Sequence, residues 1–205
     1  MNFFRKKEHK DIEVNGIHSV SAFRSAQNNN LLKVINNLPH IKNVLNLGAV
    51  QGDSDKEGKL YKDYFLKKEY FTLDKFRNDS SQNHFNLDME EMDMAHVKFD
   101  LILFMSVLEH LKNPKKVIDK LKFALNPGGY IYVTSPFMYP LHKAKDSGYT
   151  DYWRFTDDGL RELFYEYSEE WILEVKSVIN EVNDRPRHWS HSKTPTGYCA
   201  LFSYP

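Results

Sequence analysis

The feature that most constrains the fold is an alternation between short apolar runs and segments with helical spacing. Residues 44–47 and 99–104 are apolar runs of strand length, and Gly48 follows the first of them. The segments between such runs carry apolar residues three and four positions apart, which is typical of amphipathic helices. Strands separated by helices favour a parallel sheet with helices on both of its faces.

The expected elements follow from this alternation. Helices are predicted over 22–38, 53–67, from Asn113-Pro114 to Pro127-Gly128-Gly129, and over 157–167. Strands are predicted over 44–47, 70–73, 84–87, 99–104, 130–135, 171–179 and 198–203. No helix separates the last two strands, so we expect a mostly parallel seven-stranded sheet whose last strand is antiparallel. The length suits a single α/β domain over 1–205, with a helical cap segment over 1–40 and the sheet core over 41–205.

Composition excludes several classes of partner. Lysine plus arginine and aspartate plus glutamate both number 28, so no net charge attracts nucleic acid. Cys199 is the only cysteine, which rules out an intramolecular disulfide and favours a reducing, cytoplasmic location. We expect no membrane span, because no run of ~18 apolar residues occurs. We expect no metal either, because His188 and His191 lack supporting carboxylates.

The loop after the first expected strand has the character of a cofactor loop. Gly48 and Gly52 lie between that strand and the following helical segment, where glycines let backbone approach a ligand. Asp74 ends the second expected strand, about 20 residues after Gly52. A carboxylate at that spacing is suited to bind ribose hydroxyls.

With these residues the chain resembles the class I S-adenosylmethionine-dependent methyltransferases, in particular those with a Leu-Glu-His-Leu signature after the fourth strand. The similarity runs from about Val44 to Phe164 and is carried by residues 45–52, 73–74, 107–111 and 125–129. It implies a Rossmann-like methyltransferase fold, S-adenosyl-L-methionine as cofactor and S-adenosyl-L-homocysteine as product. It also implies cofactor contacts from Asn46, Gly48, Gly52, Asp74, Asp88, Met89, Met105 and Ser106.

Two positions depart from that family. Asn46 stands where an acidic residue is usual, and Val50 stands where a glycine is usual. Asparagine lacks the charge to hold the cofactor's ammonium group, and a positive φ is costly for β-branched valine. These departures favour the alternative of a catalytically inactive binding or scaffold protein with this fold, whereas Asp74 and the intact 108–111 signature favour an enzyme.

The acceptor is expected to bind the segment that leaves the fifth strand, residues 136–155. Residues 151–156 resemble a stretch in methyltransferase-like proteins of bacterial surface-glycan biosynthesis, which implies a sugar-type or capsule-precursor acceptor and a role in polysaccharide biosynthesis. Aromatic rings stack on sugars, and arginine binds phosphate or carboxylate. In the alternative interpretation the aromatic residues anchor the segment to the core and Arg154 pairs with a nearby acid. The candidate acceptor-binding residues are Tyr149, Tyr152, Trp153, Arg154 and His188.

Methyl transfer is an in-line displacement that depends mainly on alignment, and a hydroxyl acceptor also benefits from a general base. His110 follows the fourth strand and is the first candidate for that base, with His142 and Asp151 behind it. His110 could instead have a structural role and bond to backbone. An N-methyltransferase would need less help from a base. We therefore predict an O-methyltransferase for a small sugar-type molecule, with N-methyl transfer as the alternative.

Overall fold

The computed structural model describes residues 22–49, 53–77, 81–93, 96–141, 149–175 and 195–205. These residues form one seven-stranded sheet. Its strands are β1 (Asn43–Leu47), β2 (Glu69–Leu73), β3 (His84–Phe85), β4 (Phe99–Met105), β5 (Leu125–Pro136), β6 (Ser168–Val175) and β7 (Gly197–Ser203).

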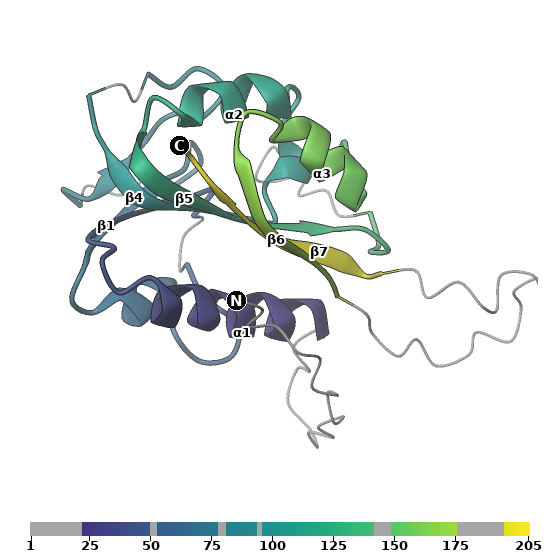
Figure 1. The fold of residues 1–205 in the computed structure, drawn as a ribbon, viewed down its shortest axis with the longest axis horizontal. Coiled ribbons are helices and arrows are strands. Elements are labelled where there is room, and N and C mark those ends of the chain that lie inside the picture. The colour runs from purple at the N-terminus through teal and green to yellow at the C-terminus, as the bar shows by residue number, and fades with distance from the viewer. Residues whose placement is uncertain (1–21, 50–52, 78–80, 94–95, 142–148, 176–194) are drawn as a thin grey trace, which may run out of the picture.

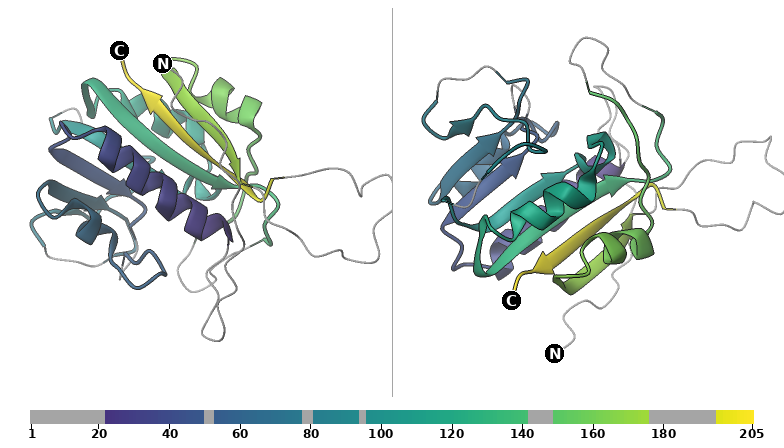
Figure 2. Two further views of the ribbon diagram at one scale, coloured as in Figure 1. Left: turned by 60° about the horizontal axis from the view of Figure 1, so that its bottom comes forward. Right: turned by 90° about the horizontal axis from the view of Figure 1, so that it is seen from above.

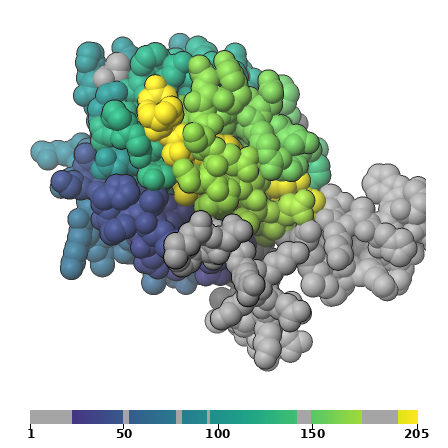
Figure 3. Space-filling model, in the orientation of Figure 1, coloured from purple at the N-terminus to yellow at the C-terminus, as the bar shows by residue number. Residues whose placement is uncertain are grey.

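The strands lie in the order β3-β2-β1-β4-β5-β7-β6. Neighbours from β3 to β5 pair in parallel, whereas β7 pairs antiparallel with both β5 and β6. β7 is thus an inner strand, visible in Figure 3 as yellow atoms between teal and green ones. The predicted sheet, with its antiparallel last strand, is confirmed. Strand order reverses between β1 and β4, and ligands bind such sheets outside the carboxyl ends of the strands at that point.

Helices cover both faces of the sheet, as predicted. α1 (Ala22–Asn37) lies on one face, and α2 (Pro114–Leu121) and α3 (Asp157–Leu163) lie on the other (Figures 1 and 2). The short 3-10 helix η1 (Tyr61–Phe65) joins α1 in its apolar cluster. Within the described parts of the chain, no helix combines the length and apolar character that crossing a bilayer requires.

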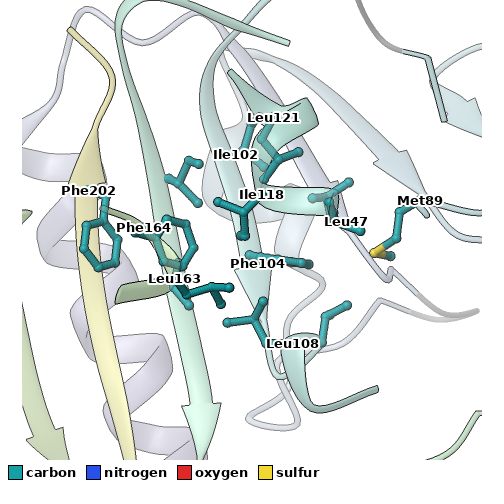
Figure 4. Close-up of a cluster of buried hydrophobic side chains, with 14 of the residues drawn as sticks. Leu47, Met89, Ile102, Phe104, Leu108, Ile118, Leu121, Leu163, Phe164 and Phe202 are labelled. Atoms are coloured by element: carbon teal, nitrogen blue, oxygen red, sulfur yellow. The ribbon is translucent and has the colours of Figure 1, made fainter. Parts of the chain in front are cut away.

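The core is divided between the two faces by the alternation of side chains along each strand. In β4, Ile102 and Phe104 belong to the cluster under α2 and α3, whereas Leu101 and Leu103 belong to the cluster under α1. Figure 4 shows Ile102 near Ile118 and Leu121 of α2, within the first cluster. A strand buried on both faces reads as a continuous apolar run, which is why this strand was evident from sequence.

α1 is fixed to the sheet by a buried amide. Gln27 is fully buried, and its Oε1 accepts hydrogen bonds from Thr134 Oγ1 (2.9 Å) and Ser106 Oγ (3.3 Å). The hydroxyl of Tyr132 donates to the backbone carbonyl of Gln27 (2.7 Å). These bonds satisfy a polar group that would be costly to bury alone, and they set the position of α1 over β5.

The expected end of the helix that begins at Asn113-Pro114 was wrong. α2 begins as predicted, with Pro114 in its first turn and Asn113 Oδ1 accepting from Lys116 N (3.1 Å), but it ends at Leu121. The predicted helix end at 127–129 lies instead within β5, where the pairing with β4 shifts register. Gly128 has φ 72° there, which fits a glycine in an irregular strand.

The predicted helix over 53–67 is also wrong, because only η1 forms there. Asp55 Oδ1 accepts hydrogen bonds from the backbone N–H groups of Glu57 (2.7 Å) and Lys59 (2.9 Å). Lys56 and Gly58 have φ values of 65° and 104°. An aspartate that binds nearby backbone N–H groups offers the chain an alternative to helix, and here it forms a turn before η1.

Candidate cofactor and acceptor site

A cavity of about 500 Å³ opens at the carboxyl ends of β1, β2 and β4, where the strand order reverses. Its volume lies in the range of small-molecule sites. Ten of the residues predicted from sequence line it: Asn46, Gly48, Asp74, Asp88, Met89, Met105, Ser106, His110, Tyr149 and Tyr152.

Gly48, directly after β1, has a backbone conformation that any other residue would adopt only with strain. Its φ is 69°, and its N–H donates to the carbonyl of Leu73 (2.8 Å). A Cβ at this position would lie 2.6 Å from Cγ2 of Val107. The glycine therefore allows β1, β2 and the turn after β4 to meet closely at the cavity.

Asn46 is part of a three-residue network at the end of β1. Its Nδ2 donates to Asp53 Oδ1 and to the hydroxyl oxygen of Tyr70, both at 2.9 Å. The Tyr70 hydroxyl donates to Asp53 Oδ2 (2.6 Å). Burial raises the pKa of the Asp53 carboxyl, while the bonds from Tyr70 and Asn46 act in the opposite direction. The uncharged side chain of Asn46 thus holds a carboxyl group that itself lines the cavity.

Asp74 follows β2 and is nearly buried. Its Oδ1 accepts hydrogen bonds from the backbone N–H groups of Phe76 (2.6 Å) and Arg77 (3.0 Å). Its Oδ2 accepts none from the residues that the structure describes. Because Asp74 lines the cavity, that oxygen has the capacity to accept from the hydroxyls of a ribose.

An apolar slot lies beside Asp74. Phe76 and Leu87 line the cavity and are 46% and 42% exposed, so their apolar surfaces are accessible to a ligand. Met89 lines the same region, and Asp88 is held by Lys75 (Oδ2 to Nζ, 2.7 Å). Such a slot suits a flat ring such as adenine.

The end of β4 brings backbone strain to the cavity. Ser106 has φ 54°, a left-handed conformation that non-glycine residues rarely adopt and that is concentrated at functional sites. Its N–H donates to the carbonyl of Thr134 (2.9 Å), and its hydroxyl donates to Gln27. Met105 and Ser106 are thereby held at the floor of the cavity by β5 and α1.

The Leu-Glu-His-Leu signature forms a 3-10 turn, η2 (Leu108–His110), that the segment from Tyr149 crosses. His110 Nδ1 lies 3.0 Å from the carbonyl oxygen of Thr150, and its ring is 4.6 Å from that of Tyr149. The N–H of Tyr152 donates to the carbonyl of Glu109 (2.7 Å). The Glu109 side chain is fully buried, and burial raises its pKa to about 8.

Three residues that were predicted to act on the acceptor, Asp151, Trp153 and Arg154, bind each other or the backbone instead of lining the cavity. Arg154 donates from both terminal nitrogens to the two carboxylate oxygens of Asp151, with Nη2 to Oδ2 at 2.7 Å. Trp153 Nε1 donates to the carbonyl of Leu111 (2.8 Å), and the side chain is 44% exposed. None of the three belongs to the described lining of the cavity. The alternative in which Arg154 pairs with a nearby acid therefore matches their geometry.

Three predicted residues, Gly52, His142 and His188, lie outside the described residues, as does Val50. Conversely, sequence reasoning overlooked several residues that line the cavity. The most informative are Arg24, Asp53, Lys56, Phe76 and Leu87. Asp53 follows Gly52 directly. Because Asn46 is uncharged, the acidic residue beside Gly52 was the signal in the sequence from which Asp53 could have been found.

Comparison with known proteins agrees with this geometry. Residues 23–175 match the family model described as a methyltransferase domain. No curated protein matches the sequence significantly. Among solved structures, the chain is similar to an S-adenosylmethionine-dependent methyltransferase from Mesorhizobium loti, with a TM-score of 0.60 and 12% identity over 88% of this chain and 99% of that one.

Two further structures have the same fold. The N-methyltransferase NodS from Bradyrhizobium japonicum WM9, solved with S-adenosyl-L-homocysteine, gives a TM-score of 0.57 and 14% identity over 89% of this chain and 88% of that one. A methyltransferase solved in complex with the Haloferax volcanii Trm112 activator gives a TM-score of 0.56 and 12% identity over 90% and 95%.

The fold and the cavity thus define a class I, Rossmann-like methyltransferase. The chain belongs to the methyltransferase domain family and is an S-adenosylmethionine-dependent methyltransferase. The residues present fit that cofactor: Asp74 offers a free carboxylate oxygen for ribose, and Phe76 and Leu87 offer an apolar slot for adenine.

Proposed function

We propose that the enzyme transfers the methyl group to a hydroxyl of a small, sugar-type acceptor, with His110 as general base. The observation that carries this proposal is the orientation of His110 in the cavity, with Nδ1 3.0 Å from the carbonyl oxygen of Thr150. A carbonyl oxygen only accepts hydrogen bonds, so Nδ1 holds the proton of the neutral ring. Nε2, which lies 3.9 Å from Oε1 of the buried Glu109, then carries the lone pair and can take a proton from a hydroxyl.

S-adenosylmethionine supplies the methyl group, bonded to a sulfonium sulfur, when it is bound. The chain aligns the two reactants and keeps water away from them. His110 lines the same cavity as Met105 and Ser106, so an acceptor hydroxyl that reaches His110 shares one compartment with the cofactor.

The segment over η2 supports a ring-shaped acceptor. Tyr149 and Tyr152 line the cavity, and Trp153, which lies outside the described lining, anchors the segment through Nε1 to the carbonyl of Leu111. Aromatic faces held in place stack on sugar rings at little entropic cost. The Asp151–Arg154 pair is the connection that holds this segment in shape, so we assign both residues positioning roles.

An amine acceptor is the second candidate. It is favoured by the likeness to NodS, whose name describes an N-methyltransferase, and it would depend less on a general base. The extent to which the reaction depends on His110 therefore distinguishes the two candidates.

The test measures S-adenosylhomocysteine production with a panel of nucleotide sugars and monosaccharides and their amino-sugar counterparts. His110→Asn preserves a donor where Nδ1 stands and removes Nε2. It should lower kcat with hydroxyl acceptors by about 10²- to 10⁴-fold, with unchanged affinity for S-adenosylhomocysteine. His40→Asn is the matched control and should leave kcat unchanged, because the His40 ring is exposed, lies 6.2 Å from that of Tyr130 and is not part of the described cavity lining. Preferred turnover of amino sugars, or an unchanged kcat in His110→Asn, would contradict the proposal.

A further inference from the structure

The methionine end of the cofactor brings an ammonium and a carboxylate group into the cavity, yet Asn46, at the end of β1, carries no charge to meet either of them. We propose that Asp53 binds the ammonium group and that Arg24 binds the carboxylate group. In this proposal Asp53 supplies the acidic group in place of the residue at the end of β1, and Asn46 at that position holds the Asp53 side chain.

The position of Asp53 within the cavity singles it out among the acidic residues. The described lining contains Asp53, Asp74, Asp88 and Glu90. The last three follow β2 and β3, on the side where the ribose and adenine features lie. Asp53 instead accepts a hydrogen bond from Asn46 at the end of β1, next to Gly48, and another from Tyr70 of β2. It is therefore the carboxylate of the described lining that is bonded to the end of β1 beside Gly48.

The carboxylate of Asp53 is oriented and still has capacity to accept. Asn46 Nδ2 donates to its Oδ1, and the Tyr70 hydroxyl donates to its Oδ2. A carboxylate offers roughly four lone-pair positions, so two donors leave room for an ammonium group. Two neutral donors that hold both oxygens in advance reduce the entropy lost when the cation binds.

Arg24 provides the complementary charge from α1. Its Nη1 donates to the hydroxyl oxygen of Tyr61 (3.1 Å), and both residues line the cavity. The Tyr61 hydroxyl also accepts from Gln27 Nε2 (2.9 Å) and donates to Asn28 Oδ1 (2.9 Å). A planar guanidinium anchored in this way matches the two oxygens of a carboxylate.

Titration of Asp53 provides a second signature. Burial raises the pKa of its carboxyl group in the protein without ligand, and an arriving ammonium group favours the charged form. Binding of the amino-acid portion should therefore weaken as pH falls towards the raised pKa. This pH effect concerns only the binding of the cofactor. The assignment of Asp53 and Arg24 would therefore stand even if the enzyme methylated no sugar.

The test is calorimetric titration of the full chain with two ligands, S-adenosylhomocysteine and 5′-methylthioadenosine. The second has the same adenosine and thioether sulfur but lacks the amino-acid portion. Asp53→Asn should weaken binding of S-adenosylhomocysteine by about 10-fold or more and leave methylthioadenosine binding unchanged. Arg24→Met should act in the same direction. Asp119→Asn, an exposed aspartate paired with Lys115 on α2, is the matched control and should alter neither affinity.

Methylthioadenosine binding also shows whether each variant retains its fold. Equal losses for both ligands in Asp53→Asn would overturn the proposal, because they would assign Asp53 a role in loop structure. An unchanged affinity for S-adenosylhomocysteine would overturn it as well. In the wild type, the preference for S-adenosylhomocysteine should shrink as pH falls towards the raised pKa of Asp53, and Asp53→Asn should remove that dependence.

Discussion

Gly48 shows how one residue holds the cofactor edge of the sheet together. It combines a left-handed φ of 69° with the close approach of Val107, whose turn follows β4. These are separate costs for any other residue, one from backbone sterics and one from side-chain overlap.

Gly48→Ala should therefore lower the free energy of unfolding by about 2–4 kcal/mol. Gly128→Ala is a matched control, because Gly128 has a φ of 72° and open space where a Cβ would lie. It should cost about 1–2 kcal/mol. Urea denaturation of both variants separates the two contributions. Equal losses would show that the contact with Val107 has no energetic weight.

Asp53 shows why part of the site could not be predicted residue by residue. Its place in the cavity depends on hydrogen bonds from Asn46 and from Tyr70, which belongs to another strand. Gly48 and Asp74, by contrast, were predicted because each follows a strand directly, and the fold alone brings such positions together.

At the scale of elements, η2 contains a buried acid that makes stability depend on pH. Burial raises the pKa of Glu109 from an ordinary 4.5 to about 8, with the charge of Asp151 adding to this shift and Arg154 opposing it. Between these two values the folded protein binds more protons at Glu109 than the unfolded chain does. The contribution of Glu109 to stability therefore falls as pH rises through that range.

Glu109→Gln removes this titration and keeps nearly the same shape. The variant should be more stable than the wild type at about pH 8.5, and the difference should shrink towards about pH 5, where the wild-type carboxyl is protonated. Chemical denaturation at several pH values measures it. A difference that stays constant with pH would show that Glu109 does not titrate in this range.

Elements were predictable where local signals agreed with the fold. α2 has an asparagine cap and a proline in its first turn, and β4 is apolar at every position except Asp100. The segment 53–67 has helix-like apolar spacing, but the bonds from Asp55 to backbone produce a turn instead. Apolar spacing does not report such competition, because it depends on one polar side chain and the local backbone.

At the scale of the whole molecule, the start of α1 meets the start of β7, although the two are far apart in sequence. Phe23 of α1 packs on Gly197 at the start of β7, where a Cβ would lie 2.3 Å from Cε2 of Phe23 and 2.7 Å from the carbonyl oxygen of Ser135. Arg24, which lines the cavity, is the next residue of α1. The position of the cavity wall thus depends on a glycine remote from it in sequence.

Gly197→Ala should displace α1, lower the free energy of unfolding by about 1–3 kcal/mol and weaken binding of S-adenosylhomocysteine. Phe23→Ala should cost less stability in the Gly197→Ala background than in the wild type, because it removes the ring that the new methyl group meets. A double-mutant cycle followed by thermal denaturation measures this coupling. Additive losses would contradict the proposed contact.

The packing of α1 against β5, β6 and β7 also has a consequence for how the enzyme folds. α1 precedes the strands of the sheet in the chain, but the surface that receives it is formed by β5, β6 and β7, the last three strands of the described sheet. A nascent chain that already contains every signature residue still lacks the platform that orients Arg24 and Gln27. The platform that orients Arg24 therefore forms only when β7 has paired with β5 and β6, and cofactor binding should report that this pairing has taken place.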